Sequence, residues 1–318
     1  FFFLAMAVAL ASQFARNLDE ADRRATELAD LNVSIQRFVP FAFLRLLERA
    51  SVREVKRGDA AATAMSVMFC DLRGFTTLAE RMGPDETFRF INRYLERMEP
   101  EIHKAGGFIN QYLGDGIMAL FPGGADAAVD AAVGMSRALE IMNSERKAQG
   151  EPLLRIGIGI HTGPLMLGTI GGGDQLDSGV VGDTVNTAAR LEGITKMYGA
   201  AVLISGATMT ALKNPAHRAL RPLDAVKAKG KSEPLALVEV LDADPKALRD
   251  VKLADRGELE LAIGLYRKGH FQDAAVRFGA LAARSPDDGA ARAFAERCAA
   301  LVLAPPDAWD GVLSLTTK

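Results

Sequence analysis

Hydrophobic positions between residues 64 and 242 follow two periods in turn, an alternating one typical of strands and a longer one typical of amphipathic helices. The resulting order is βαββαβ, with glycines at the sharp corners. It favours an α+β fold with an antiparallel or mixed sheet backed by helices over a doubly wound parallel sheet. The predicted strands are 65–71, 107–113, 116–121, 153–161, 163–169, 201–205 and a pair ending near Val240. The predicted helices are 75–104, 124–148, 183–198 and a short one after residue 205.

A second hydrophobic pattern precedes this region and has the 3.5-residue period of a coiled coil. It predicts a short parallel coiled coil over residues 14–37, whose polar seam residue Asn32 would fix the register. A single amphipathic helix packed on its own domain is the alternative, because the seam is short and contains two alanines. Pro40 is expected to end the helix, and residues 38–63 then form a connector. The seam positions are Phe14, Leu18, Ala21, Ala25, Leu28, Asn32 and Ile35.

The first residues, FFFLAMAVAL, form an apolar run without charge. Because a bilayer span needs ~20 such residues, residues 1–13 are expected to be the end of a transmembrane helix, with a buried helix end as the alternative. Arg16, Arg23 and Arg24 follow the run, and positive charge beside a span favours the cytoplasmic side. The expected location is therefore the cell inner membrane, with the rest of the chain in the cytoplasm.

Residues 243–318 are rich in alanine and predict a helical tail. Aromatic and small residues recur there with the spacing of a tetratricopeptide-like helical hairpin. Because such repeats need about three copies to stand alone, a single copy is expected to pack on the preceding domain or on a partner; a plain helical tail is the alternative. The residues that fit the repeat are Tyr266, Gly269, Phe271, Ala274, Phe278 and Pro286.

Composition narrows the possible functions. With 318 residues, 49% of them hydrophobic, the chain can bury one large core or two smaller ones. A formal net charge of -2 argues against nucleic acid as a partner. The two cysteines, Cys70 and Cys298, are too far apart in sequence to indicate a disulfide framework, which fits a reducing compartment.

Two acidic residues stand where apolar strands end, Asp71 in the segment SVMFCDLRGFT and Asp115 in the segment INQYLGDGIMA. A carboxylate at a strand end, beside a glycine that lets phosphate approach the backbone, is a natural site for a metal-bound nucleotide. Two such sites indicate a pair of cations that activate a hydroxyl and stabilise a leaving phosphate. The sequence therefore predicts phosphoryl or nucleotidyl transfer.

Four segments in order, FCDLRGFT, YLGDGIMALF, VVGDTVNTAARLEG and VKAKGK, resemble those of class III nucleotidyl cyclases. The resemblance covers about residues 38–242, and the flanks are similar to bacterial membrane-tethered adenylate cyclases with a helical tail. It implies a ferredoxin-like βαββαβ palm over residues 64–242 and a homodimer. It also implies conversion of ATP to 3',5'-cyclic AMP and pyrophosphate.

The resemblance also assigns roles to residues. Asp71 and Asp115, with the Leu72 carbonyl, are expected to bind two divalent cations per site, Mg2+ or Mn2+. Backbone amides near Gly74, Phe75 and Thr76 are expected to face the triphosphate, because the start of a helix favours anions.

A second group of residues is expected to reach the same nucleotide from the other protomer. Asn186 and Arg190 stand four apart and share one helix face. The resemblance makes Asn186 an orienter of the ribose and Arg190 a stabiliser of charge at the α-phosphate. Lys229 matches the lysine that contacts phosphate. A monomer would then be inactive.

Two positions depart from the family at the site that reads the base. Gln111, four residues before Asp115, and Gly179, three before Gly182, replace the usual pair of Lys with Asp or Thr. An amide can pair with either purine, so a guanylate or mixed-specificity cyclase is the alternative to ATP use. A catalytically silent cyclase-like domain and a scaffold that acts through its tail are two further alternatives.

Overall fold

The structure is a computed structural model that describes residues 2–36, 41–172, 176–227 and 233–315. Contacts divide the chain into two compact units. One comprises Phe1–Ala61 and Gly168–Gly179, and the other comprises Ala62–Leu167 and Val180–Lys318. The larger unit therefore contains most of the predicted palm together with the C-terminal tail.

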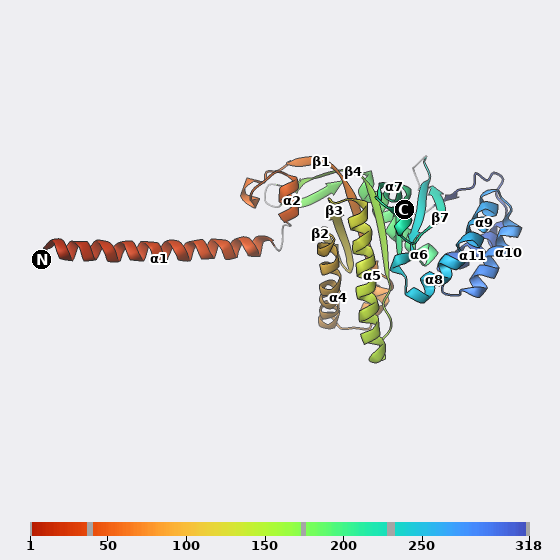
Figure 1. Cartoon of the computed structure of the whole chain (residues 1–318), viewed down its shortest axis with the longest axis horizontal. Helices are drawn as coiled ribbons and strands as arrows, with labels where there is room; N and C mark the ends of the chain where they lie inside the picture. The colour runs from red at the N-terminus through yellow and green to blue at the C-terminus, as the bar shows by residue number, and fades with distance from the viewer. Residues whose placement is uncertain (1, 37–40, 173–175, 228–232, 316–318) are drawn as a thin grey trace. The chain divides into compact units, whose positions relative to one another are not determined.

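Helices and strands alternate through the larger unit and give way to helices at its end (Figure 1). The strands are β1 (Ala60–Leu72), β2 (Phe108–Leu113), β3 (Gly116–Phe121), β4 (Ile156–Gly171), β5 (Leu176–Val181), β6 (Val202–Ser205), β7 (Leu220–Lys227), β8 (Leu235–Val240) and β9 (Leu313–Ser314). The helices of the palm are α3 (Phe75–Ala79), α4 (Pro84–Lys104), α5 (Ala125–Ala148), α6 (Asp183–Tyr198) and α7 (Gly206–Ala211). The tail contains α8 (Lys246–Ala254), α9 (Arg256–Arg267), α10 (Phe271–Arg284) and α11 (Gly289–Leu303). The N-terminal unit has α1 (Phe2–Gln36) and α2 (Phe41–Leu46), and single 3-10 turns lie at Val52–Glu54, Pro215–His217 and Leu241–Ala243.

The strands form one mixed sheet, in the order β2-β3-β1-β4-β6-β8-β7-β9, with β5 paired to β4. Neighbours β1 and β3 are antiparallel, whereas β4 and β6 are parallel. The first four strands in this order are those of the βαββαβ unit. The predicted mixed sheet is confirmed, and the doubly wound alternative is excluded for the described residues.

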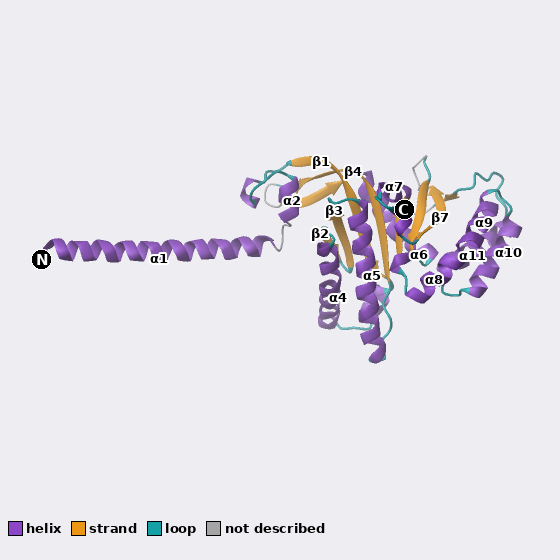
Figure 2. Ribbon diagram, in the orientation of Figure 1, coloured by secondary structure: helices purple, strands orange, loops and turns teal. Residues whose placement is uncertain are grey.

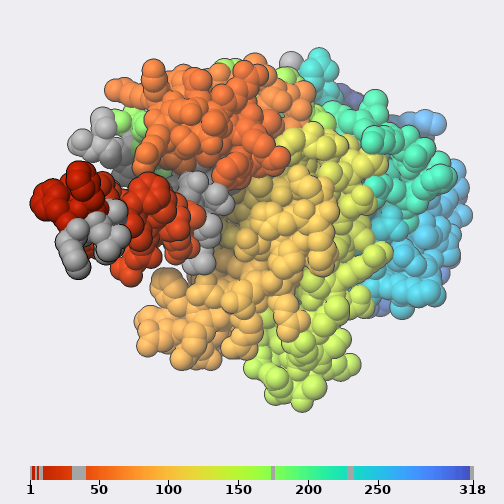
Figure 3. Space-filling view, turned by 60° about the vertical axis from the view of Figure 1, so that its left-hand side comes forward, coloured from red at the N-terminus to blue at the C-terminus, as the bar shows by residue number. Residues whose placement is uncertain are grey.

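The sheet separates two apolar cores, because side chains alternate between its faces along each strand. On β6, Val202 and Ile204 join a core with α4 and α5, whereas Leu203 joins a second core with α6 and the tail. Helices α4 and α5 lie side by side over the first face (Figure 2) and form one continuous outer surface (Figure 3). The tail helices therefore act as a cover for the second face.

Several local predictions need correction. The helix predicted over 75–104 is two helices, because Pro84 begins α4 after the extended residue Gly83. The strands predicted at 153–161 and 163–169 are one strand, β4, in which pairing with neighbours overrides the turn signal of Gly163-Pro164. Strand β5 was not predicted, and neither was β9.

The N-terminal unit combines a long helix with a clasped connector. Side chains of α1 at the predicted seam positions Phe14, Leu18 and Leu28 are exposed. In the connector, Arg49 makes two hydrogen bonds of 3.0 Å each to the Asp59 carboxylate. Seam side chains 32 and 35, together with Pro40, lie outside the described side chains. Among the described residues, no helix combines the length and the hydropathy needed to span a bilayer.

The tail packs on the sheet, which decides between the two arrangements that its sequence left open. Tyr266, Ala274 and Phe278, three of the positions that fit the tetratricopeptide spacing, are buried in the second core. Phe278 stacks on Phe294 with ring centroids 4.7 Å apart. After α11 the chain returns, and β9 pairs in parallel with the end of β7. The tail thus completes the second core with helices and extends the sheet with a strand.

Candidate active site

Strand register brings Asp71 and Asp115 together. Strands β1 and β3 pair antiparallel up to Cys70 opposite Ile117, so the next residues of β1 lie opposite the turn that contains Asp115. A two-residue turn joins β2 to β3, with Leu113 paired to Gly116. Gly114 adopts a φ of 67° in this turn, a conformation that favours glycine in short hairpins. The hairpin thus holds the Asp115 side chain beside the end of β1.

Burial and the neighbouring Asp71 perturb the Asp115 carboxylate. Burial raises the pKa of Asp115 to about 6, and the neighbouring charge of Asp71 adds to the rise. The backbone N–H of Leu72 donates a hydrogen bond to the Asp115 carboxylate, which lowers the pKa and so opposes this rise. No cationic side chain is among the groups that most affect this pKa in the described part of the chain. A positive charge placed between the carboxylates would relieve the repulsion.

The donor set at this point suits a divalent cation. Ionised carboxylates and a backbone carbonyl are oxygen ligands of the kind that Mg2+ and Mn2+ take. Leu72 ends β1 and is buried, so its carbonyl is fixed next to Asp71. Within the described ranges, no group of three or more His, Cys, Asp or Glu side chains could hold a metal by itself. Cations at Asp71 and Asp115 would therefore need further oxygens, which the phosphates of a nucleotide can supply.

A hydrogen bond, a left-handed glycine and a ring contact fix the loop that follows Asp71. The backbone N–H of Arg73 donates to the Arg155 carbonyl at 2.8 Å. Gly74 takes a left-handed φ of 70° and precedes α3. The Phe75 ring stacks on Phe90 of α4 at 6.1 Å, and Thr76 is exposed. The backbone of this loop is thereby fixed, while the first turn of α3 keeps amides that the short helix does not use internally.

Arg73 joins this loop to α6. Its guanidinium forms an ion pair of 2.9 Å with Glu192 Oε1 and donates to the Glu192 carbonyl at 3.0 Å. It also contacts the Thr195 hydroxyl. Arg73 thus connects the loop after Asp71 directly to helix α6, which carries Asn186 and Arg190, within one protomer.

Asn186 and Arg190 lie on the side of α6 roughly opposite to the Thr195 side chain that Arg73 contacts. Thr195 follows Asn186 by nine residues, which is two and a half turns at 3.6 residues per turn, so the two lie on opposite sides of α6. Arg73 holds the Thr195 side. Asn186 is exposed and Arg190 is half-buried, so both can reach a ligand outside their own chain. The structure brings Asp71, Leu72 and Asp115 together, and Asn186 and Arg190 lie on another element, helix α6.

The base-reading positions fall in different units. Gln111 is exposed on β2, just after an extra residue, Asn110, that interrupts the pairing of β2 with β3. Such a bulge turns the following side chain out of the regular alternation. Gly179 lies in β5 of the N-terminal unit, where an added Cβ would stand 2.1 Å from Cδ1 of Ile170. Lys229 lies outside the described residues.

The model of the adenylate and guanylate cyclase catalytic domain family matches residues 59–238. The chain belongs to this family. An adenylate cyclase of Anabaena cylindrica is 44% identical over 213 residues, which cover 65% of this chain and 42% of the relative. The chain therefore spans less than half of that cyclase.

Solved cyclase structures agree with the fold. The guanylyl cyclase Cya2 is 32% identical, with a TM-score of 0.50, and the match covers 57% of this chain and 93% of that one. The adenylyl cyclase CyaB from P. aeruginosa is 29% identical, with a TM-score of 0.51, covering 57% and 95%. The palm fold expected of a class III cyclase is confirmed.

Sequence reasoning missed the residues that connect the loop after Asp71 to helix α6. Glu192 and Thr195 contact Arg73 across more than a hundred positions of sequence. Arg73 and Glu192 stand inside the segments FCDLRGFT and VVGDTVNTAARLEG, which was the available signal. Their opposite charges, each beside a candidate ligand residue, could have suggested a pair.

We expect Asp115→Asn to stabilise the metal-free protein at neutral pH. Because the folded-state pKa is raised, the penalty for ionising Asp115 is absent below its ordinary pKa of 3.8 and complete above about 6. At pH 7.5 the gain should be on the order of 1 kcal/mol after allowance for solvent screening of this half-exposed pair. That corresponds to roughly 2–4 °C in the melting midpoint, measured by calorimetry, and it should vanish at pH 4.

Mn2+ supplies the second readout. It should raise the midpoint of the wild type and have much less effect on Asp115→Asn, whereas the exposed Asp307→Asn should behave as wild type. Equal midpoints for wild type and Asp115→Asn in metal-free buffer at pH 7.5 would show that the carboxylates do not repel each other in the folded protein.

Proposed function

We propose that this protein is a nucleotidyl cyclase that converts ATP to 3',5'-cyclic AMP and pyrophosphate at sites shared by two protomers. The observation that carries the proposal is the carboxylate pair at the end of β1, where burial and then the neighbouring charge of Asp71 raise the pKa of Asp115 to about 6. Such a pair favours a cation and a polyphosphate over a neutral ligand. Membership of the cyclase family and the 44% identity to an adenylate cyclase support the same conclusion.

The reaction is an internal displacement. The ribose 3'-oxygen attacks the α-phosphorus, the bond between the α-phosphorus and the bridging oxygen of the leaving pyrophosphate breaks, and the hydroxyl proton passes to solvent. Two divalent cations, Mg2+ or Mn2+, would lower the pKa of the hydroxyl and neutralise the leaving phosphates when bound by Asp71, Leu72 and Asp115. The amides at Gly74, Phe75 and Thr76 would hold the phosphate chain in line for the attack.

The partner protomer would supply the remaining groups. Arg190 would stabilise the charge that develops on the α-phosphate, and the Asn186 amide would orient the ribose. Lys229, also from the partner protomer, would contact phosphate. The supporting observation is that Asn186 and Arg190 lie on the side of α6 roughly opposite to the side that Arg73 contacts. In a homodimer, these residues of each protomer would meet the carboxylates of the other.

A mixing experiment tests the shared site. Asp71→Ala and Arg190→Ala should each lose about 100-fold or more in kcat with ATP and Mn2+, because each removes charge stabilisation. Mixed and allowed to exchange, the two variants should recover up to about a quarter of the wild-type rate, since half of the dimers then carry one intact site. Cyclic AMP formation is the measurement, and Asp307→Ala is the matched control. Absence of recovery in a mixture shown to contain heterodimers would rule out the shared site.

Guanylate or mixed use is the second candidate, and the observation behind it is the pair Gln111 and Gly179. The Gln111 amide can donate or accept, so it can pair with N1 and N6 of adenine or with O6 and N1 of guanine. Ile170 occupies the space in which a side chain at position 179 would begin. Discrimination at this site then rests on one ambivalent group, which weakens it.

Gln111→Lys is expected to shift the choice toward ATP. Lys restores the residue that family members use for adenine, and the ratio of kcat/KM for ATP to that for GTP should rise by about 10-fold. Steady-state rates with both nucleotides give this ratio, and Gln111→Ala should lower both rates without a comparable shift. Loss of ATP turnover with retained GTP turnover in Gln111→Lys would contradict the expectation that Lys at position 111 favours adenine.

We further propose that α1 pairs with its copy as a coiled coil, and that its apolar start attaches the protein to the inner membrane with the cyclase domain in the cytoplasm. Exposed apolar side chains on α1, including Phe3, Phe14 and Leu18, support both ideas. Deletion of residues 1–37 should lower the specific activity at low protein concentration and abolish sedimentation with anionic lipid vesicles. Unchanged activity and unchanged sedimentation would remove the role proposed for this segment.

A further inference from the structure

The tail meets α6 without intervening side chains. Gly199 ends α6, and a Cβ added there would stand 3.0 Å from Cα of Gly289, the first residue of α11. Backbone therefore lies against backbone at this junction. Any displacement of α11 is transmitted directly to the end of α6.

A buried clamp fixes the same junction. Tyr198, in the last turn of α6, donates its hydroxyl to Asp224 of β7 at 2.5 Å. Arg297 of α11 donates to the same carboxylate at 2.7 Å and to the Tyr198 hydroxyl at 3.0 Å. Its guanidinium also lies over the Phe294 ring, 5.0 Å from the centroid. The Tyr198–Asp224–Arg297 clamp thus ties α6, β7 and α11 to one another.

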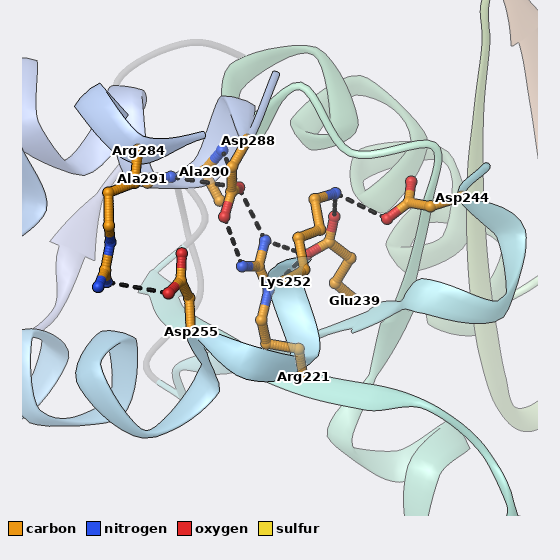
Figure 4. A network of polar contacts seen from close by, with 9 residues as sticks. All are labelled: Arg221, Glu239, Asp244, Lys252, Asp255, Arg284, Asp288, Ala290 and Ala291. Atoms are coloured by element: carbon orange, nitrogen blue, oxygen red, sulfur yellow. Dashed lines mark hydrogen bonds and ion pairs between the residues drawn. The ribbon is translucent and has the colours of Figure 1, made fainter. Parts of the chain in front are cut away.

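A buried charge network holds α11 in place from the other side (Figure 4). Arg221 of β7 makes two hydrogen bonds to Asp288, which precedes α11, at 2.6 and 2.9 Å. It also bonds Glu239 of β8 at 2.8 Å, and Lys252 of α8 bonds Glu239 at 2.7 Å. Asp288 in turn accepts from the first amides of α11. The start of α11 is therefore fixed to β7 and β8 by directional, desolvated contacts.

A small tilt at the clamp becomes a large displacement at the substrate end of α6. Asn186 lies twelve residues before Tyr198, roughly 18 Å away at 1.5 Å per residue. The clamp acts together with Arg73, which contacts the middle of α6 at Glu192 and Thr195. A tilt of roughly 3° about the clamp would move Asn186 by about 1 Å, a misplacement that can cost about 100-fold in rate. Arg190 lies on the same helix and would be displaced as well.

We propose that the C-terminal tail is a positioning element of the half-site donated to the partner: the clamp sets Asn186 and Arg190 against the carboxylates of the other protomer. The inference rests on the proposed function and goes beyond it, because it assigns the tail to one half of each shared site. Arg297, Tyr198 and Asp224 are positioning residues, since they act through α6.

The test uses full-length chains in mixed dimers with one intact site. That site takes its carboxylates from the Arg190→Ala chain and its Asn186 and Arg190 from the Asp71→Ala chain. Arg297→Met is placed in either chain. In the Asp71→Ala chain it should lower kcat by about 10-fold or more, with the Mn2+ activation constant within twofold. In the Arg190→Ala chain it should leave kcat within twofold.

The two arrangements control for stability, because each dimer contains the same substituted tail once. Arg277→Met, which removes an exposed ion pair with Glu258 on the same tail, should have no effect in either chain. Arg297→Lys in the Asp71→Ala chain should recover part of the rate. If Arg297→Met fails to give soluble dimers, Tyr198→Phe takes its place and should show the same asymmetry.

The outcomes are separable. Equal losses in the two arrangements, or no loss in either, would overturn the positioning role while leaving the shared site intact. If mixed dimers of the Asp71→Ala and Arg190→Ala chains with unsubstituted tails recover no activity, the proposed function is overturned, and this inference with it.

Discussion

Asp71 and Asp115 are held together by the register of β1 against β3, although their charges repel each other. The hairpin turn at Gly114 places one carboxylate, and the end of a buried strand places the other. Burial, and then the neighbouring charge of Asp71, raise the pKa of Asp115. Such an arrangement gains stability when a cation binds, so the fold and the metal-dependent chemistry proposed for it share one cause.

The rest of the larger unit is arranged around α6. One side of this helix faces the sheet, Arg73 holds Glu192 and Thr195, and the tail holds Tyr198. The face left over carries Asn186 and Arg190. A helix fixed at its middle and at its end presents its remaining side chains with little freedom, which is the preorganisation that charge stabilisation requires.

Local patterns in the sequence were sufficient to predict most of the fold and the carboxylate pair. The alternating and helical periods gave the βαββαβ order, and the strand-end positions of Asp71 and Asp115 identified the carboxylate pair. The break before Pro84 and the continuous β4 were missed, because one depends on a single cap and the other on neighbouring strands. Strand β5 follows glycine-rich sequence, and its pairing to β4 has no periodic signal of its own. The contacts of Arg73 with Glu192, and of Arg221 with Asp288, join distant segments and could not be read from spacing.

The tail shows why long-range contacts decide what a segment is for. Its spacing predicted a tetratricopeptide-like hairpin, whereas the structure shows Tyr266, Ala274 and Phe278 buried in the core against the cyclase sheet. Apolar packing alone would allow the tail to slide, because hydrophobic contacts have little directionality. Arg221 and Lys252 remove that freedom: each is almost fully buried, and each bonds carboxylates at fixed angles. A buried ion pair of this kind adds little net stability over an apolar pair, but an unmatched charge is costly, so only one alignment of tail and sheet satisfies every member. Alignment is the property that a helix carrying Asn186 and Arg190 needs most.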